Sequence, residues 1–162
     1  MNKVGWRSPS NIALVKYWGK YANQLPANPS ISFTLSTSVT ETFLSWETAP
    51  QGKGGNIVVL LDDVLAPSFE PKIAQFFKRV AHVVPFFNDY NFVINTHNSF
   101  PHSSGIASSA SGMSALALCT LGMAQKLGYN FHDFFKEASV LARLGSGSAS
   151  RSVYGPLAVW GE

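Results

Sequence analysis

The sequence has a single cysteine, Cys119, among its 162 residues. One cysteine excludes an intramolecular disulfide and gives no support for a secreted domain held together by disulfides. Because the neighbours of Cys119 in the sequence are apolar, we expect Cys119 to be a small buried residue of the core. The four histidines stand far apart along the chain, without the spacing of metal ligands. The sequence therefore offers neither a disulfide framework nor a histidine metal site.

Charge is also scarce, because only 13% of the residues are charged. The 12 Lys and Arg are scattered and form no run typical of a nucleic-acid-binding arm, while the net charge of +3 suits a small anionic substrate. No window reaches the roughly 18 consecutive apolar residues of a membrane span, and the first residues lack the apolar core of a signal peptide. We expect a cytoplasmic protein that binds neither nucleic acid nor a membrane.

The 46% hydrophobic content argues against disorder, and the length suits one domain, residues 1–162. Alternation over 31–46 puts Phe33 and Phe43 on one face and Ser and Thr on the other, which indicates a half-buried strand. We expect the aromatic residues to alternate into core faces. The pattern predicts strands at 10–18, 31–46, 56–61, 91–96 and 152–160, and helices at 70–84, 106–127 and from an Asn130 cap to Gly145. This order indicates an α+β fold with a mixed sheet and helices on one face.

One segment, from Ser99 to Gly112, combines the features of a phosphate-binding loop. It follows a predicted strand and opens the longest predicted helix, so its unpaired N–H groups converge on one point with the helix dipole behind them. Gly105 lets a ligand approach the backbone closely. Several serine hydroxyls lie in the loop, whereas no acidic side chain does. We expect this loop to bind the triphosphate of ATP.

The loop differs from the common P-loop, G-x-x-x-x-G-K-[ST], because no lysine lies between Lys78 and Lys126. A helix start that is rich in Ser and Ala only for close packing would have a similar composition. The preceding Pro101 and the order strand, loop, helix favour phosphate binding.

Three motifs resemble those of a known enzyme family. The string from Pro101 to Ala110 resembles the central motif of the GHMP kinase superfamily. The strings Asn11–Lys20, with 25–32 after it, and Arg143–Gly155 resemble those of the mevalonate diphosphate decarboxylases within it. The three motifs span nearly the whole chain in the family's order. The resemblance implies a GHMP-kinase N-terminal domain, like domain 2 of ribosomal protein S5. It also implies ATP- and Mg²⁺-dependent decarboxylation of mevalonate 5-diphosphate to isopentenyl diphosphate.

The resemblance also implies roles for individual residues. Arg151 would bind the carboxylate that is lost as carbon dioxide, since a guanidinium fork fits a planar carboxylate, and Lys20 would bind the diphosphate. Both are candidate catalytic residues. The further substrate-binding candidates are Asn11, Tyr17, Ser146 and Ser148. The ATP-binding candidates are Pro101, Ser103, Ser104, Gly105, Ala107, Ser108 and Ser109, of which Ser108 or Ser109 is expected to face magnesium.

The chain departs from the family pattern at two places. Ser150 stands where the family usually has cysteine, and the string Pro101–Gly105 replaces P-T-A-A-G. Neither change removes a required charge. We expect His102 to be exposed and Arg143 to be a cation at a helix C-terminus rather than a ligand.

A catalytic carboxylate is missing from the motifs. None of the nine acidic residues lies in or beside them, although a base or orienting group is expected near the substrate 3-hydroxyl. The resemblance places that aspartate beyond residue 162. We therefore expect the chain to be the N-terminal half of a longer enzyme that is a homodimer at full length, and to be inactive alone.

Two other readings remain open. Mevalonate monophosphate decarboxylase and mevalonate 3-kinase are sister activities that a similar site could support. A non-catalytic, S5-like binding module belongs to a different class, and the dispersed basic residues disfavour it.

Overall fold

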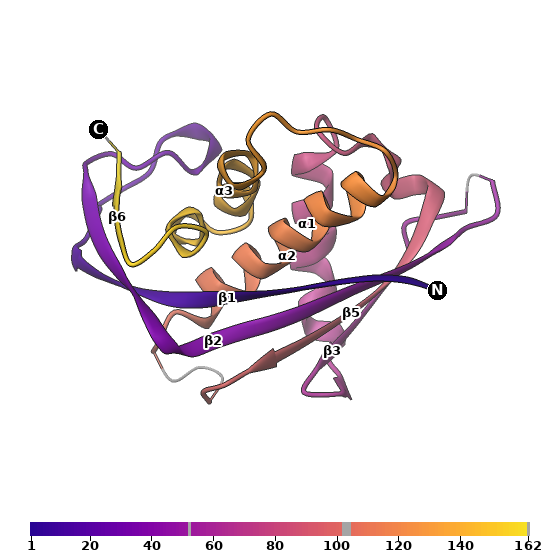
Figure 1. Ribbon diagram of the computed structural model, residues 1–162, viewed down its shortest axis with the longest axis horizontal. Coiled ribbons are helices and arrows are strands. Elements are labelled where there is room, and N and C mark those ends of the chain that lie inside the picture. The colour runs from indigo at the N-terminus through magenta and orange to yellow at the C-terminus, as the bar shows by residue number, and fades with distance from the viewer. Residues whose placement is uncertain (52, 102–104, 162) are drawn as a thin grey trace.

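The computed structural model describes residues 1–51, 53–101 and 105–161. Within these ranges a twisted sheet forms one layer, and the α-helices pack on one face of it (Figure 1). The expected α+β fold, with a mixed sheet and helices on one face, is confirmed. The strands are β1 (Asn2–Val15), β2 (Ser30–Thr48), β3 (Ile57–Leu61), β4 (Val64–Leu65), β5 (Tyr90–Asn98) and β6 (Leu157–Trp160). The α-helices are α1 (Glu70–Val80), α2 (Ser108–Lys126) and α3 (Phe134–Gly145), and the 3₁₀ helices are η1 (Ala22–Gln24), η2 (Pro67–Phe69), η3 (Pro85–Asp89) and η4 (Gly147–Ser152).

The long strand β2 organises the sheet, whose order is β1-β2-β5-β3-β4. One edge of β2 pairs antiparallel with β1. Its other edge pairs with β6 through Ser30–Phe33 and with β5 through Thr40–Thr48. Only β3 and β5 run parallel among the described pairings. Because β2 carries both β6 and β5, it links the end of the described chain to the strand that precedes the predicted phosphate loop.

The faces of β2 are a correction to the expected pattern. The hydroxyl face is the buried one: Thr40 is 1% exposed, whereas Phe43 is only partly buried. The Thr40 hydroxyl lies 2.7 Å from Asn98 Oδ1 and 2.7 Å from the Ser111 hydroxyl of α2. Phe43 lies on the opposite face, where the Lys3 ammonium is 4.2 Å from its ring centroid. Alternation shows which residues share a face, but it does not show that paired hydroxyls can occupy the core.

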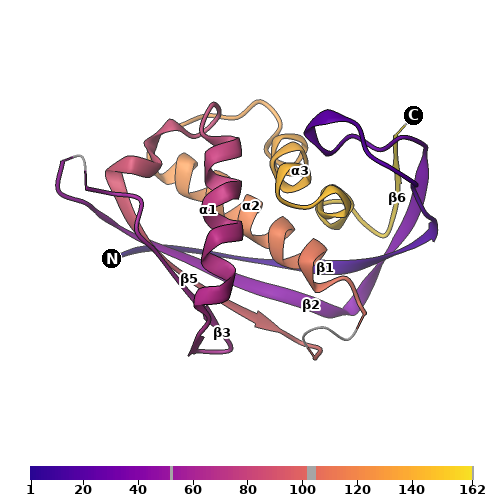
Figure 2. The same cartoon turned by 180° about the vertical axis from the view of Figure 1, so that it is seen from behind.

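Helix α2 is the centre of the helical layer. It lies between the sheet and the other α-helices (Figure 2), and it contacts β1, β2 and α3. Its buried residues surround the helix rather than forming one stripe. Alanine and serine are frequent among them and allow close packing. Helix α1 ends at Val80, not at residue 84. Its buried residues are Ile73, Phe76, Phe77 and Val80. No helix among the described residues is long and apolar enough to cross a membrane.

Several predicted boundaries were wrong. The strand expected at 10–18 begins at Asn2 and ends at Val15, which leaves Tyr17 and Lys20 in the loop after it. The strand expected at 152–160 is reduced to β6, since the chain first forms η4. Small residues with paired hydroxyls favour this tight turn over a strand.

The cap of α3 is also a correction. Asp133, not Asn130, is the N-cap, because its carboxylate accepts a hydrogen bond of 3.0 Å from the Lys136 N–H. Gly128 takes a left-handed conformation after α2, with φ of +92°. Arg143 lies in the last turn of α3, as expected of a C-terminal cation.

Candidate active site

The start of α2 was predicted to bind phosphate, and its backbone is described from Gly105 onward. Gly105 has a φ of +81°, and among the described residues no atom outside its chain neighbours lies within 4 Å of the position that a side chain would take there. Ala107, the N-cap, has a left-handed φ of 52° and offers no side-chain hydrogen bond to the first turn. The Ala110 N–H donates to the Ala107 carbonyl at 2.8 Å, so the N–H groups before it in the chain are the ones suited to an external acceptor. Pro101 is exposed, while the predicted Ser103 and Ser104, and His102, lie outside the described residues.

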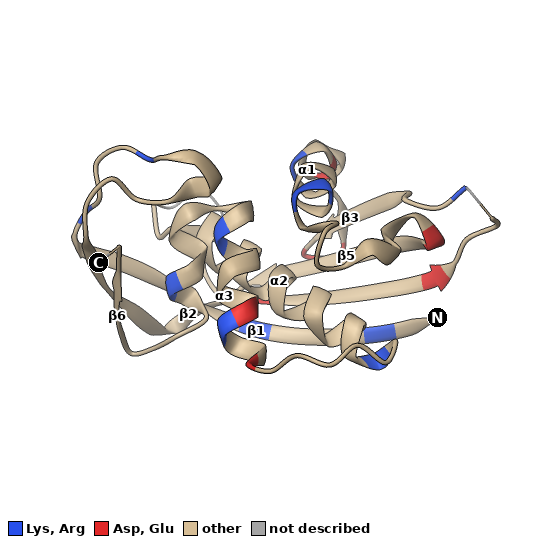
Figure 3. Ribbon diagram, turned by 90° about the horizontal axis from the view of Figure 1, so that it is seen from above, with Lys and Arg blue, Asp and Glu red and all other residues tan. Residues whose placement is uncertain are grey.

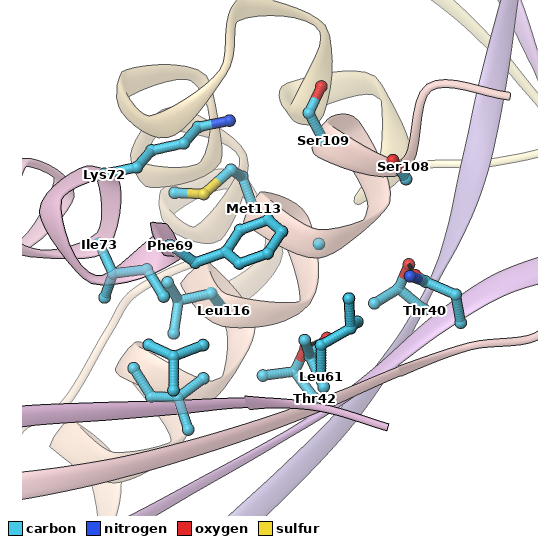
Figure 4. Close-up of a pocket in the computed structure, with 15 residues that line it drawn as sticks. Thr40, Thr42, Leu61, Phe69, Lys72, Ile73, Ser108, Ser109, Met113 and Leu116 are labelled. Carbon is cyan, nitrogen blue, oxygen red and sulfur yellow. Dashed lines mark hydrogen bonds between the residues drawn. The ribbon is translucent and has the colours of Figure 1, made fainter. Parts of the chain in front are cut away.

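A cavity of about 360 Å³ opens beside this helix start, between α1, α2 and the sheet (Figure 4). Ser108 and Ser109 line it from the first turn of α2. Figure 4 shows the Lys72 side chain extending from α1 over the cavity toward this turn. Lys72 is the only cation among the described lining residues. The others are Thr40, Thr42, Val59, Leu61, Phe69, Ile73, Ile94, Thr96, Asn98, Gly112, Met113 and Leu116.

An apolar cavity that meets an anion-binding loop is suited to a nucleotide, because the base needs burial and the phosphates need N–H groups. Apart from Ser108 and Ser109, the sequence motifs did not predict the residues that line the cavity. The lining residues come from η2, α1, α2, β2, β3 and β5, and no local pattern marks residues that meet only in the folded sheet.

Arg151 is the centre of a second cluster. It is 5% exposed, and its Nη1 donates a hydrogen bond of 2.7 Å to the Ser30 hydroxyl. Its Cζ lies 5.7 Å from the ring centroids of both Tyr17 and Trp160. Its Nε is buried without a hydrogen-bond partner among the described residues. Burial lowers the pKa of Arg151, and Tyr17 opposes that shift. Among the described residues, no carboxylate lies within 4.0 Å of this guanidinium.

Two further predicted residues meet the backbone of Gly147. A side-chain carbon at Gly147 would lie 3.2 Å from the Tyr17 hydroxyl and 3.3 Å from Lys20 Nζ. The Lys20 ammonium also donates a hydrogen bond of 2.7 Å to Gln24 Oε1 in η1. Ser146 and Ser148 flank Gly147 in the chain, so the structure brings the predicted lysine, tyrosine and serine segment together. Gln24 was not predicted, and no sequence signal marks it.

Asn11 supports the cluster from β1. It is 3% exposed, and its Nδ2 donates to the Ser148 carbonyl at 3.1 Å and to the Ser152 hydroxyl at 2.6 Å. Its Oδ1 is buried and accepts no hydrogen bond from the part of the chain that the structure describes. A buried amide oxygen is costly when it accepts no hydrogen bond, so this atom and Arg151 Nε offer an acceptor and a donor to a polar ligand.

Strand β1 connects the Arg151 cluster with the start of α2 through hydrogen bonds. The Ser8 hydroxyl donates to the Ser152 carbonyl at 3.0 Å and lies 2.7 Å from the Ser114 hydroxyl of α2. The Ser10 hydroxyl donates to the Ile106 carbonyl just before α2. These contacts hold η4 and the start of α2 against one strand. The anion-binding loop and the Arg151 cluster are thus parts of one buried polar network.

The positively charged side chains near the site are isolated from one another rather than clustered. Figure 3 shows Lys and Arg spread over several elements rather than gathered in one block. The described residues contain no group of three His, Cys, Asp or Glu that could hold a metal ion. Hydroxyls and N–H groups thus dominate the site.

A protein-family comparison matches residues 8–162 to the diphosphomevalonate decarboxylase-like N-terminal domain. The chain belongs to this family. Curated relatives include the diphosphomevalonate decarboxylases of Eremothecium gossypii, 32% identical over 171 residues, and Saccharomyces cerevisiae, 34% identical over 163 residues. Each match covers 94% of this chain and 40% of the relative. The chain therefore spans about two fifths of the length of these decarboxylases.

Solved decarboxylase structures share the fold. The mevalonate diphosphate decarboxylase of Staphylococcus aureus has a TM-score of 0.81 and 34% identity, over 98% of this chain and 46% of that chain. The Enterococcus faecalis enzyme has a TM-score of 0.80 and 34% identity, over 98% of this chain and 47% of that one. A third structure is described as MDDEF in complex with MVAPP, AMPPCP and magnesium. It has a TM-score of 0.79 and 34% identity, and the match covers 98% of this chain and 46% of that one. The expected family and fold are confirmed.

Proposed function

We propose that this chain provides the nucleotide- and substrate-binding portion of an ATP-dependent decarboxylase that acts on mevalonate 5-diphosphate. The observation that carries the proposal is the buried Arg151, which has a free Nε and no carboxylate partner among the described residues. A buried guanidinium without an anion is costly, so a ligand carboxylate that pairs with it gains affinity.

The substrate roles follow from the positions of the side chains. The carboxylate binds to Arg151, and the diphosphate lies between Lys20 and the serine segment 146–148. Asn11 Oδ1 accepts a hydrogen bond from the substrate hydroxyl. Tyr17 packs beside both cations, with Lys20 Nζ and Arg151 Cζ each 5.7 Å from its ring centroid.

ATP fits the other part of the network. The base and ribose occupy the cavity beside α2, and the phosphates meet the N–H groups from Gly105 to Ser109. The ammonium group of Lys72, which extends from α1, contacts the phosphates. The hydroxyls of Ser108 and Ser109 suit Mg²⁺, which takes oxygen ligands and usually combines one or two protein oxygens with phosphate and water. The ion, when bound, neutralises charge on the phosphates.

The reaction then runs in two stages. The substrate 3-hydroxyl oxygen attacks the γ-phosphorus of ATP, its proton passes to a carboxylate base, and ADP leaves. Next the C1–C2 bond breaks, and its electron pair forms the C2–C3 double bond while phosphate leaves C3. Carbon dioxide and isopentenyl diphosphate result. No residue assigned to the substrate carries a carboxylate. We therefore propose that the base is supplied by the part of the decarboxylases that this chain does not span, and that the chain alone is inactive.

Calorimetric titration with mevalonate 5-diphosphate tests the substrate part. Arg151→Met should weaken binding by at least about thirtyfold, since breaking a buried charge pair costs about 2–5 kcal/mol. Arg143→Met, at the end of α3, is the matched control and should bind like the unaltered chain. Tighter binding of the 5-monophosphate would favour the sister decarboxylase. No binding of either ligand, or equal binding by Arg151→Met, would contradict the proposal.

Titration with MgATP tests the nucleotide part. Lys72→Met should weaken binding about tenfold, because the variant loses the only cation that lines the cavity among the described residues. Lys78→Met removes a lysine of the same helix that does not line the cavity and should leave the affinity unchanged. Equal affinities for all three proteins would place ATP elsewhere.

A further inference from the structure

Trp160 forms a wall of the Arg151 cluster that the sequence motifs did not predict. It is the last residue of β6, and its Cα pairs with that of Ser30 at the start of β2. Directly paired residues of antiparallel strands project to the same face of the sheet. The pairing therefore presents an indole ring and a hydroxyl side by side.

Both groups contact the guanidinium of Arg151. The Ser30 hydroxyl accepts from Nη1 at 2.7 Å, and the Trp160 ring centroid lies 5.7 Å from Cζ. Tyr17 completes the enclosure, with its ring 5.0 Å from that of Trp160 at an interplanar angle of 88°. An aromatic ring attracts a cation without using an N–H donor. The Nε of Arg151 is buried and has no hydrogen-bond partner among the described residues.

Resting on the proposed function, we infer that Trp160 and Ser30 are positioning residues that hold Arg151 ready for the substrate carboxylate. Arginine has many rotamers, and fixing it in advance lowers the entropy cost of binding. Trp160 supplies attraction to the cation, and Ser30 fixes the rotation of the guanidinium by occupying one Nη.

Side-chain NMR of the 162-residue chain tests the positioning without any ligand. The Arg151 Nε–H signal, assigned by its loss in Arg151→Lys, should be ring-current shifted, and its Nη protons should exchange slowly by rotation. Trp160→Leu should remove the shift and speed the rotation, whereas Trp160→Phe should retain most of both. Val159→Ala, on the same strand at a residue that is 55% exposed, is the control. Unchanged Arg151 signals in Trp160→Leu would overturn the inference.

Two ligands test the consequence for binding. Mevalonate 5-diphosphate carries the carboxylate, and isopentenyl diphosphate keeps the diphosphate but lacks it. Trp160→Leu should weaken binding of the first about five- to thirtyfold and Ser30→Ala about three- to tenfold. Binding of the second should change less than about twofold. Equal losses for both ligands would mean a general structural role and would overturn the inference.

The two hypotheses fail in different ways. If the unaltered chain binds neither diphosphate, the proposed function fails, while the NMR comparison still decides whether Trp160 and Ser30 hold Arg151. If the chain binds the substrate but the variants bind it equally well, the positioning role fails and the proposed function stands. Melting temperatures show whether each variant is folded.

Discussion

The same substitution at two glycines of α2 should have opposite effects on stability. At Gly112 no atom of the described residues, apart from the neighbouring helix backbone, lies within 4 Å of the position of an added methyl group. Gly112→Ala should therefore stabilise the chain by about 0.5–1 kcal/mol, the usual helix preference for alanine. At Gly122 the methyl group would lie 3.0 Å from Val4 Cγ2 and 3.1 Å from Trp6 Nε1.

The neighbours of Gly122 have little room to yield, because the Trp6 ring is stacked on Phe134 at a centroid distance of 5.4 Å. Overpacking costs about 1–3 kcal/mol, which offsets or exceeds the helix gain. Gly112→Ala should thus be more stable than Gly122→Ala by about 1–3 kcal/mol. Urea unfolding followed by circular dichroism measures the difference, and equal stabilities would refute the packing described around α2.

Gly112 also lines the cavity beside α2. Its added methyl group would occupy nucleotide space, so Gly112→Ala should bind MgATP several-fold more weakly although it is more stable. Gly122→Ala should keep the affinity of the unaltered chain. A Gly112→Ala variant with unchanged MgATP affinity would show that the nucleotide does not use this cavity.

Three further predictions concern stability. Thr40→Val removes the hydroxyl that contacts Asn98 Oδ1 and the Ser111 hydroxyl, so it should lower the free energy of unfolding in urea by about 1–3 kcal/mol. Thr48→Val, at an exposed position, should lower it by less than about 0.5 kcal/mol. Equal effects of the two substitutions would contradict a buried hydroxyl face. Burial raises the pKa of Cys119 to about 12, so the unfolded thiol ionises first and stability should fall as pH rises above about 9. Cys119→Ala should flatten that alkaline slope by about 1 kcal/mol per pH unit, and parallel slopes would exclude the effect. Asp133→Ala should cost about 1 kcal/mol through the lost cap, and Asp133→Asn should restore most of it; a destabilised Asn variant would point to charge instead.

The sequence predicted elements and motifs better than it predicted faces. Apolar spacing located α1 and α2 within a few residues, and the loop before α2 was recognised from glycine and serine ahead of a helix. Helices and loops are local, so a local pattern records them. That Lys20, Tyr17 and Arg151 share one site was implied by the family resemblance of the motifs.

Features that depend on pairing between distant segments were not predicted. The burial of Thr40 needs Asn98 and Ser111, which come from β5 and α2. Likewise, the contact of Trp160 with Arg151 depends on the pairing of β6 with Ser30. Hydropathy alone treats a hydroxyl as a surface group and cannot register the partner that makes its burial tolerable.

The most direct test of the account is a crystal structure of the chain with mevalonate 5-diphosphate. The account predicts that the ligand carboxylate accepts a hydrogen bond from Arg151 Nε, with Trp160 in place beside the guanidinium. It also predicts that the diphosphate contacts Lys20 and the segment 146–148. A ligand bound in the reverse orientation, or a carboxylate away from Arg151, would contradict the central claim.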